Sequence, residues 1–315
     1  MPAATPDGYT AGNRQGVSPT LLLRATHRMH LSDLFRAGRP VFSIELFPPK
    51  TAAGMENLTR RLQALPALAP DYVSVTYGAG GGTRHNTMAV CTTLLDLGLE
   101  VMAHLTCVSH TREEIGERLA ELGAVGIDKI MALRGDPPQG ETTFKPPAGG
   151  FRYAAQLVAA IKATAGFAVG VAGYPEGHAE APGYEVDLAR QIEKIQTGAD
   201  VVVSQFFLHN DRVLRWRDDL RRAGVAAPIE AGVLPALSAA QIEGFAAACG
   251  VAVPPALLAG LEKLKDDKEG AAAFGLDFAL RQVEGLLAEG VDGIHLFALN
   301  RLAPVRAVAP LVLGK

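Results

Sequence analysis

Short runs of β-branched and other apolar residues alternate along the chain with longer segments of helical spacing. Eight such runs follow residue 40, at 41–47, 72–78, 100–107, 129–136, 168–175, 201–208, 228–235 and 293–300. In the intervening segments the apolar positions recur every three to four residues, as on one face of a helix, and several segments end at glycine. Helices are therefore predicted at 113–123, 153–164, 185–198, 238–249, 254–265 and 267–289.

This alternation predicts an α/β fold with a parallel sheet, and eight strand–helix units predict its closure into a (β/α)8 barrel, or TIM barrel. The first six strand ends recur every 28 to 38 residues, which is the length of one unit. An open doubly wound sheet is the main alternative. It is disfavoured because no G-x-G-x-x-G motif follows the first run. The segment between the last two runs, 228–235 and 293–300, is longer than the others, and we interpret it as holding an extra helix inserted before the last strand.

The first part of the chain shows neither the helical nor the strand period. We predict an N-terminal arm at 1–38, partly disordered, followed by one barrel domain at 39–315. The only apolar run of the arm, at 21–23, is too short for a secretory signal, and no segment has the run of about 20 apolar residues that a membrane span requires. We therefore expect a cytoplasmic protein. Hydrophobic residues make up 48% of the 315 positions, which is enough for a large core.

Charge and cysteine usage narrow the partners further. A formal net charge of -3 provides no basic excess for binding nucleic acid or an anionic membrane. Cys91, Cys107 and Cys249 show no paired spacing, which indicates a reducing compartment and small buried side chains. His104 and Cys107 resemble half of a metal site, but no further ligands close it, so no metal is expected.

Parallel strands of a barrel are covered by helices and are normally apolar throughout, whereas these strands carry polar residues in a regular phase. Apolar residues occupy one set of alternate positions, and the other set holds Ser43, Glu45, Ser74, Thr76, His104, Arg134, Asp136 and Gln205. The apolar set should face the helices and the polar set should face the interior near the carboxyl ends, where barrel enzymes keep their chemistry. Desolvating a carboxylate there costs several kcal/mol, so Glu45 and Asp136 are candidate functional residues, and burial should raise the pKa of Glu45. The alternative is that each carboxylate pairs with a cation and only plugs the barrel.

At these residues the chain resembles the methylenetetrahydrofolate reductase family. The matching segments are SIELFPPK, VSVTYGAGG, AHLTC, ALRGDPP, GYPEGH, SQFF, GVLP and ALNR, in this order between residues 41 and 301. Each segment is weak alone, but together they are specific. The resemblance covers the barrel and not the arm, and it is closest in extent to the short bacterial form, which has the catalytic barrel only.

The resemblance implies a flavin-dependent oxidoreductase that reduces 5,10-methylenetetrahydrofolate to 5-methyltetrahydrofolate with NADH or NADPH, for methionine synthesis. It implies that Glu45 is the general acid for the folate and that Asp136 lies between flavin and pterin. Substrate contacts would come from Gln205, Phe245, Gln241 and Arg301, although Gln241 and Arg301 also suit surface roles. FAD contacts would come from Thr76, His104, Arg134, Gly135, Asp136, Tyr153, Ala154, Tyr174, His178, Asp187 and Lys194.

These residue types suit a dinucleotide, since Arg134 and Lys194 can neutralise a diphosphate and Tyr174 can line a flat ring. Lys194 could instead be a solvated helix charge, Tyr174 a core aromatic and Tyr153 a residue that starts a helix. The run 78–82, glycine except for Ala79, could cradle a phosphate or form a mobile loop at the barrel mouth.

The chain also departs from the family pattern. Arg190 stands where the family often has a smaller polar residue, and Glu230 and Ala231 precede GVLP where an apolar residue and a proline are common. The family forms homo-oligomers, and the same is expected here. The sequence does not choose between NADH and NADPH.

Two other functions fit a barrel of this kind. A Schiff-base aldolase would need a lysine at a strand end, and none of the eight runs ends in one. A folate- or flavin-binding barrel that has lost catalysis could act as a carrier or regulatory subunit. The presence of both Glu45 and Asp136 disfavours this second alternative, because simple binding needs no proton donor.

Overall fold

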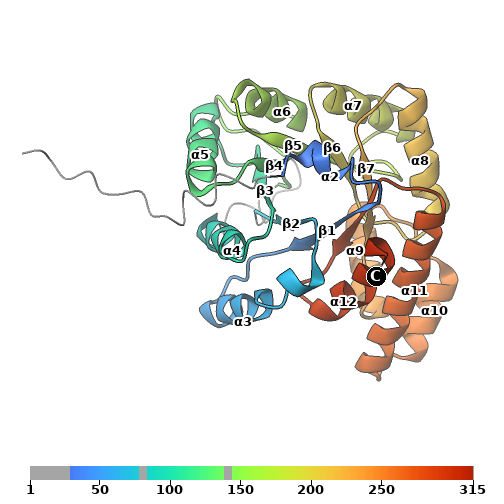
Figure 1. Ribbon diagram of the computed structural model, residues 1–315. Coiled ribbons are helices and arrows are strands. Elements are labelled where there is room, and N and C mark those ends of the chain that lie inside the picture. Colours follow the sequence, from blue (N-terminus) through green and yellow to red (C-terminus); the bar gives the residue numbers. More distant parts are fainter. Residues whose placement is uncertain (1–28, 78–83, 138–143, 315) are drawn as a thin grey trace, which may run out of the picture.

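The structure is a computed structural model, and it describes residues 29–77, 84–137 and 144–314. Most of the predicted N-terminal arm and the glycine run at 78–82 lie outside these residues. Eight parallel strands form a closed barrel in sequence order (Figure 1). The strands are β1 (Val41–Leu46), β2 (Tyr72–Val75), β3 (Val101–Thr106), β4 (Lys129–Leu133), β5 (Ala168–Gly173), β6 (Val201–Ser204), β7 (Ile229–Val233) and β8 (Gly293–Phe297). The predicted (β/α)8 barrel is therefore confirmed.

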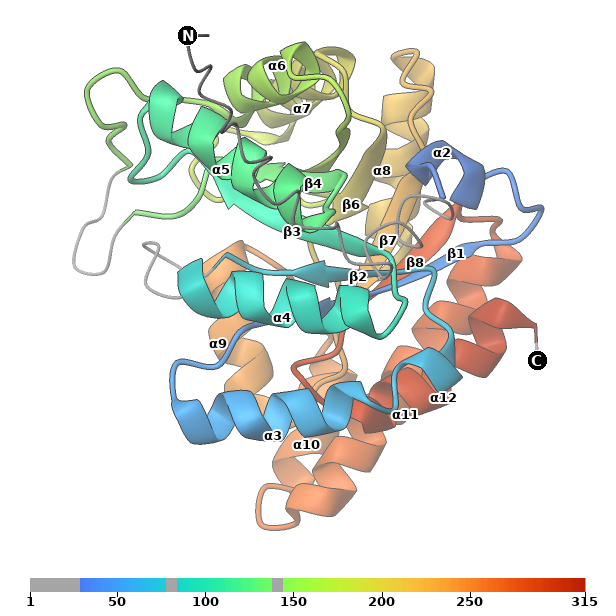
Figure 2. The same ribbon diagram turned by 60° about the vertical axis from the view of Figure 1, so that its left-hand side comes forward.

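Helices surround the strands, as the periodicity predicted. They are α3 (Ala52–Leu62), α4 (Arg84–Asp96), α5 (Arg112–Val125), α6 (Ala154–Ala163), α7 (Tyr184–Gln196), α8 (Asn210–Arg222) and α12 (Leu302–Leu313), with a 3-10 turn η1 (Pro66–Leu68). Figure 2 shows α3 and α4 side by side on the outside of the barrel. The α5 helix begins with a capping box made by Thr111 and Glu114 and ends at Gly126, whose φ of 100° suits glycine.

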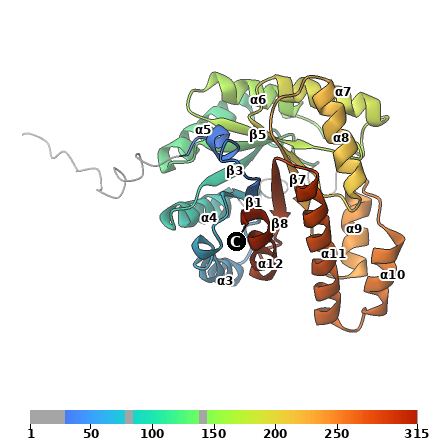
Figure 3. The same ribbon diagram turned by 45° about the vertical axis from the view of Figure 1, so that its right-hand side comes forward.

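The long connection from β7 to β8 holds three helices, and the predicted insertion is confirmed. These are α9 (Ala239–Cys249), α10 (Pro255–Lys263) and α11 (Lys268–Ala288). Figure 3 shows α10 and α11 packed together and extending beyond the barrel beside α9. A second apolar cluster, which includes Phe206, Ile242 and Leu261, lies beneath this insertion.

The predicted phase of the strands is confirmed on β1, β2 and β3. Their apolar positions, such as Ile44 and Leu105, belong to the cluster between the strands and the helices. On β4 the prediction was wrong, because Met131 and Leu133 belong to the interior cluster. Arg134 lies beyond the last residue of β4, where strand alternation no longer fixes the direction of a side chain.

The amino end of the barrel is closed by a short helix, α2 (Leu31–Leu34). Leu31 and Leu34 are buried against Val41, Tyr72 and Met102 of three strands, and in Figure 1 α2 lies across the barrel end. This helix belongs to the segment that the sequence assigned to the arm. The domain boundary at residue 38 stays a prediction.

The three cysteines are free; Cys91 and Cys107 are buried as expected, whereas Cys249 is half-buried. Among the helices of the described ranges, none is both long and apolar enough to cross a membrane.

Candidate active site

A cavity of about 880 Å³ opens at the carboxyl ends of the strands. Its walls come from β1, β3, β4, β5 and β6, from the residues that follow β2, β4 and β5, and from Phe297 of β8. The first turn of α6 and one face of α7 complete them. Thirteen of the sixteen predicted site residues line it: Glu45, Thr76, His104, Arg134, Gly135, Asp136, Tyr153, Ala154, Tyr174, His178, Asp187, Lys194 and Gln205. Residues spread over 160 positions of the sequence are thus brought to one cavity by the alternation of strands and helices.

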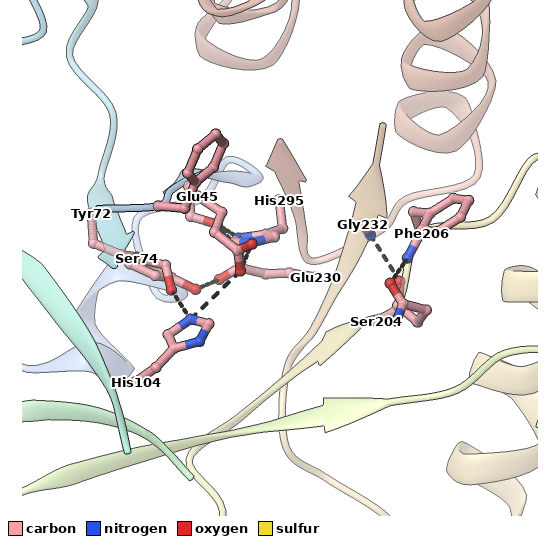
Figure 4. Close-up of polar contacts among 12 residues, drawn as sticks. Glu45, Tyr72, Ser74, His104, Ser204, Phe206, Glu230, Gly232 and His295 are labelled. Atoms are coloured by element: carbon pink, nitrogen blue, oxygen red, sulfur yellow. Dashed lines mark hydrogen bonds and ion pairs between the residues drawn. The ribbon is translucent and has the colours of Figure 1, made fainter. Parts of the chain in front are cut away.

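Glu45 is the second-last residue of β1 and lines this cavity, with its carboxyl group between two imidazoles (Figure 4). Its Oε2 atom lies 3.5 Å from Nε2 of His104 on β3 and 3.7 Å from Nε2 of His295 on β8. His104 is held in turn by Ser74 of β2, whose Oγ lies 2.6 Å from the same nitrogen. Side chains from β2, β3 and β8 therefore fix the direction in which the carboxyl group of Glu45 points.

The expected rise in the pKa of Glu45 is wrong. Burial does raise the pKa of this carboxyl group, but the facing imidazoles of His295 and His104 outweigh burial and hold the pKa below its ordinary value. Burial lowers the pKa of His104, against the attraction of Glu45. Sequence reasoning could not find this balance, because His295 follows Glu45 by 250 positions and becomes its neighbour only when the barrel closes.

A second buried carboxyl group lies deeper in the barrel. Glu230 of β7 is completely buried, and its Oε1 accepts a hydrogen bond of 2.8 Å from the hydroxyl of Tyr72. Its Oε2 accepts from the hydroxyl of Ser43, whose oxygen is also 2.7 Å from Nδ1 of His295. Burial raises the pKa of Glu230 to about 7, despite these partners.

Glu230 and His295 were not among the predicted site residues. The signal was present, since both are polar residues inside apolar strand runs. The sequence analysis noted Glu230 only as a departure from the family pattern.

The loop after β4 carries Arg134, Gly135 and Asp136. Gly135 has a φ of 84°, and a Cβ there would lie 2.7 Å from the Val108 side chain, so only glycine fits without movement. Asp136 is exposed at the rim of the cavity, which corrects the expectation that it is a desolvated carboxylate. Its neighbours on the strand side are too few to cover it, because β4 ends three residues earlier.

Arg134 makes a bidentate ion pair with Glu180 in the segment between β5 and α7. The two hydrogen bonds are 2.6 and 2.8 Å long, and the guanidinium also lies 5.2 Å from the ring centre of Phe144. A bidentate arginine presents two parallel N–H donors, which match a carboxylate or a phosphate equally well.

Lys194 is half-buried and its ammonium group is held by neighbouring groups, so it is not a freely solvated helix charge. Its ammonium group donates a 2.6 Å hydrogen bond to the carbonyl of Ala172 and lies 5.5 Å from the ring centre of Tyr174. Burial lowers the pKa of Lys194 to about 8, although Asp187 opposes this shift. The Tyr174 ring meets the His178 ring edge-on at 4.8 Å, and both line the cavity.

Asp187 organises this end of the cavity. It accepts hydrogen bonds from the backbone N–H of His178 at 3.0 Å and from the amide of Gln191 at 2.6 Å. Gln191 also bonds both backbone groups of Tyr174. Arg190, the departure noted in the sequence, lines the same region.

The first turn of α6 opens on the cavity through Tyr153, Ala154, Ala155 and Gln156. Tyr153 precedes the helix, and its side chain is 47% exposed, so it does start a helix and also remains accessible to a ligand. The helix N-terminus adds unpaired N–H groups and a partial positive charge to this wall.

Thr76 and Gln205 follow the ends of β2 and β6. The Thr76 N–H donates to the carbonyl of Leu46 at 3.0 Å, and the Gln205 N–H donates to the carbonyl of Gly173 at 2.7 Å. The Gln205 side chain turns back, because its Oε1 accepts from the N–H of Phe206 at 3.0 Å.

Three predicted substrate residues do not line the cavity. Gln241 accepts a hydrogen bond from the N–H of Leu237 at 2.8 Å, next to the start of α9. Phe245 lies on α9 with 39% of its side chain exposed, and Arg301 is the exposed residue before α12. Their proposed contacts with a substrate stay predictions. No cluster of His, Cys, Asp and Glu in the described residues has the arrangement of a metal site.

These features define a (β/α)8 barrel whose ligand cavity combines a carboxyl group between imidazoles with a wall of cationic and aromatic groups. The sequence decides the family: residues 30–310 match the family described as methylenetetrahydrofolate reductase, and the chain belongs to this family.

Known relatives agree with this membership. The chain is 38% identical over 282 residues to methylenetetrahydrofolate reductase (NADH) 1 of Arabidopsis thaliana, which covers 86% of this chain and 48% of that protein. It is 36% identical over 260 residues to 5,10-methylenetetrahydrofolate reductase of Escherichia coli, covering 82% and 86% of the two chains. The chain thus spans about half the length of the plant relatives and most of the bacterial ones.

Among solved structures, an uncharacterized protein from Clostridium thermocellum that binds two copies of 5-methyl-5,6,7,8-tetrahydrofolic acid has a similar fold. The TM-score is 0.65 at 14% identity, over 90% of this chain and 99% of that one. At this identity the likeness shows the shared barrel fold only.

Proposed function

We propose that this protein reduces 5,10-methylenetetrahydrofolate to 5-methyltetrahydrofolate, with FAD as cofactor and a reduced nicotinamide as electron donor, and so supplies methyl groups for methionine synthesis. Family membership supports the reaction. The observation that carries the proposal is the position of Glu45 in the cavity wall, where its carboxyl group faces two imidazoles that can exchange protons with it.

The cavity fits an extended dinucleotide. Its volume of about 880 Å³ is in the upper part of the range for cofactor sites. Arg134, Lys194 and the N-terminus of α6 would face the diphosphate, while Tyr174 and His178 would line ring systems. FAD, when bound, would carry the hydride from the nicotinamide to the folate. The remaining work falls to the side chains of the chain itself.

In this proposal the Arg134–Glu180 ion pair opens when an anionic ligand arrives. The phosphate would replace the carboxylate of Glu180 on the guanidinium fork, with little change in its geometry. Glu180 is about half exposed, so the displaced carboxylate can return to water at low cost.

Glu45 would protonate nitrogen 10 of the folate and open its five-membered ring. Asp136 would place a negative charge beside the cationic folate and the flavin. Gln205 would turn its amide to the pterin, which costs only the hydrogen bond to Phe206. Gln241 and Phe245 on α9 and Arg301 before α12 would contact the rest of the substrate.

The donor is NADH or NADPH. Several relatives, including those of Arabidopsis thaliana and Zea mays, are named as NADH enzymes, and we propose NADH as the first donor to test. We also propose a homo-oligomer, as in the family.

The test is a purified preparation reconstituted with FAD under anaerobic conditions. NADH or NADPH should bleach the flavin absorbance, methylenetetrahydrofolate should restore it, and mass spectrometry should identify 5-methyltetrahydrofolate. A preparation that binds FAD and folate but catalyses neither half-reaction would favour the carrier alternative.

A further inference from the structure

A continuous line of polar groups runs from the cavity into the barrel interior. It starts at Glu45 and passes to His295 at 3.7 Å, and both side chains are labelled with Glu230 in Figure 4. From the far nitrogen of the imidazole it passes to Ser43 at 2.7 Å and ends at Glu230, which Ser43 contacts directly. The first gap is longer than a hydrogen bond, so transfer across it requires the two side chains to move closer together.

The polar and titratable groups that face Glu230 come from β1, β2 and β8 and from the residue before β2. Ser43 lies on β1, Tyr72 on β2 and His295 on β8, and the carboxylate of Asp71 just before β2 contributes repulsion. Burial raises the pKa of Glu230 to about 7, so it exchanges its proton near neutral pH.

Resting on the proposed function, we propose that Glu230 is a positioning residue for Glu45: it stores a proton and returns it to Glu45 through Ser43 and His295 after Glu45 has protonated the substrate.

The proton count of this relay balances. Before transfer Glu230 is protonated, Ser43 donates to Nδ1 of His295, and the Nε2–H of His295 faces the Glu45 carboxylate. Glu230 then gives its proton to the Ser43 oxygen, Ser43 gives its own to Nδ1, and Nε2 gives its own to Glu45. Afterwards Glu230 is ionised, Ser43 donates to it, and His295 is again neutral with its proton on Nδ1.

The relay also resolves a conflict within the site. The imidazoles hold the pKa of Glu45 below its ordinary value, so at neutral pH Glu45 alone would be ionised and unable to donate. When the substrate nitrogen takes a proton from Glu45, Glu230 can return one through Ser43 and His295, so the net transfer runs from a group that is protonated near neutral pH to the substrate.

If Glu230 only filled the barrel interior, we would expect its carboxylate to be paired with a lysine or arginine side chain. Lys129 is the lysine buried in the barrel interior, and it is bound to Glu100 at 2.6 Å and to Asp128 at 2.8 Å. Glu230 is instead bound by hydroxyl groups and an imidazole, which can all exchange protons.

The test is Glu230→Gln, which keeps the shape and removes the proton. In the wild-type protein the rate of folate reduction should fall as pH rises through about 7, because Glu230 then loses its proton. In the variant this inflection should be absent and the rate at pH 6 should be lower by roughly 10-fold. Reduction of the flavin by the nicotinamide should be unchanged, since it does not use Glu45.

A second measurement needs neither cofactor nor substrate. The ¹⁵N NMR signals of the His295 ring, assigned with His295→Gln, report which nitrogen carries the proton. In the wild-type protein they should shift from the Nε2–H to the Nδ1–H form with a midpoint near pH 7, and Glu230→Gln should abolish this midpoint.

Tyr72→Phe is the matched control. It removes the hydrogen bond to Oε1 of Glu230, whereas the relay runs from Oε2 through Ser43 to His295 and contains no atom of Tyr72. The relay therefore stays intact while the pKa of Glu230 rises further, because the Tyr72 hydroxyl lowers it. The inflection and the NMR midpoint should both move to higher pH. If Glu230→Gln does not fold, Ser43→Ala breaks the relay at its middle and should remove the inflection in the same way.

An unchanged midpoint and inflection in Glu230→Gln would overturn the relay, as would equal losses in both half-reactions. If the wild-type protein reduces no folate, the proposed function fails, and the NMR titration still decides whether Glu230 controls the proton on His295.

Discussion

Single residues in this site owe their properties to neighbours that are distant in sequence. Glu45 was recognised as a candidate because it is charged within an apolar strand. Its low pKa, however, comes from His104 and His295 on two other strands. The alternation of apolar and polar residues along a strand predicts to which face a side chain points. It does not predict which charged side chains of other strands will lie beside it. Asp136 shows the converse, since it was expected to be buried and lies exposed where its strand has already ended.

Asp136 provides a test at this scale. Replacing it with asparagine keeps the shape and removes one negative charge beside the proposed flavin. We expect the reduction potential of bound FAD to rise, because a nearby negative charge disfavours the reduced, more negative flavin. Folate reduction should slow more than flavin reduction. Glu121→Gln, a change at a carboxylate of the outer helix α5, is the control, and equal potentials in Asp136→Asn and wild type would exclude this role.

At the scale of elements, the sequence predicted the eight strands, the insertion between β7 and β8 and the ranges of six helices, α5, α6, α7, α9, α10 and α11, because alternation and glycine ends are local signals. It did not predict α2, which is only four residues long and shows no period. The α2 helix is stabilised by burial of Leu31 and Leu34 under the barrel, a contact that forms only once the strands have closed. The polar residues after β4 and β6 were predicted from the strand phase and given roles by resemblance, and their side-chain partners were not predicted.

Leu31→Ala tests the role of α2 in closing the barrel. Leu31 is fully buried, so the change should lower the free energy of unfolding by about 2–5 kcal/mol through lost burial and a new cavity. FAD content should be unchanged, because the site lies at the other end of the barrel. Met29→Ala, at a side chain that is 49% exposed, is the control and should cost about 0.5 kcal/mol or less. Equal stability of Leu31→Ala and Met29→Ala in urea unfolding would show that α2 contributes nothing.

At the scale of the whole molecule, the barrel interior carries more ionisable groups than stability alone would favour. The pKa of Glu230 is raised and the pKa of Glu45 is lowered, so the two carboxyl groups titrate in different ranges of pH. Glu230 has its pKa raised from 4.5 to about 7, so the folded state holds its proton more tightly than the unfolded chain. The associated stability is present in acid and is lost as pH rises from about 4.5 to about 7. Glu45 has a lowered pKa, so its contribution is lost only as pH falls below 4.5.

The free energy of unfolding should therefore depend on pH through Glu230. Relative to Glu230→Gln, the wild-type protein should lose on the order of 3 kcal/mol of stability between pH 5 and pH 8. Urea unfolding of both proteins at the two values of pH measures this difference, and taking the difference cancels the contribution of the histidines. Parallel pH profiles for the two proteins would mean that Glu230 does not titrate in the folded state near neutral pH.

The central claim is that Glu45 supplies a proton to the folate. Reduction of the flavin by a nicotinamide needs no proton donor, so the two half-reactions separate this role from a structural one. In Glu45→Gln, FAD binding and flavin reduction should stay close to wild type, while folate reduction should slow by roughly 100-fold or more.

The decisive measurement is anaerobic stopped-flow of both half-reactions on one preparation of Glu45→Gln, with FAD content and thermal stability recorded alongside. A selective loss of folate reduction is the predicted result. Equal losses in both half-reactions, together with lower FAD content or stability, would contradict the account and make Glu45 a structural plug of the barrel.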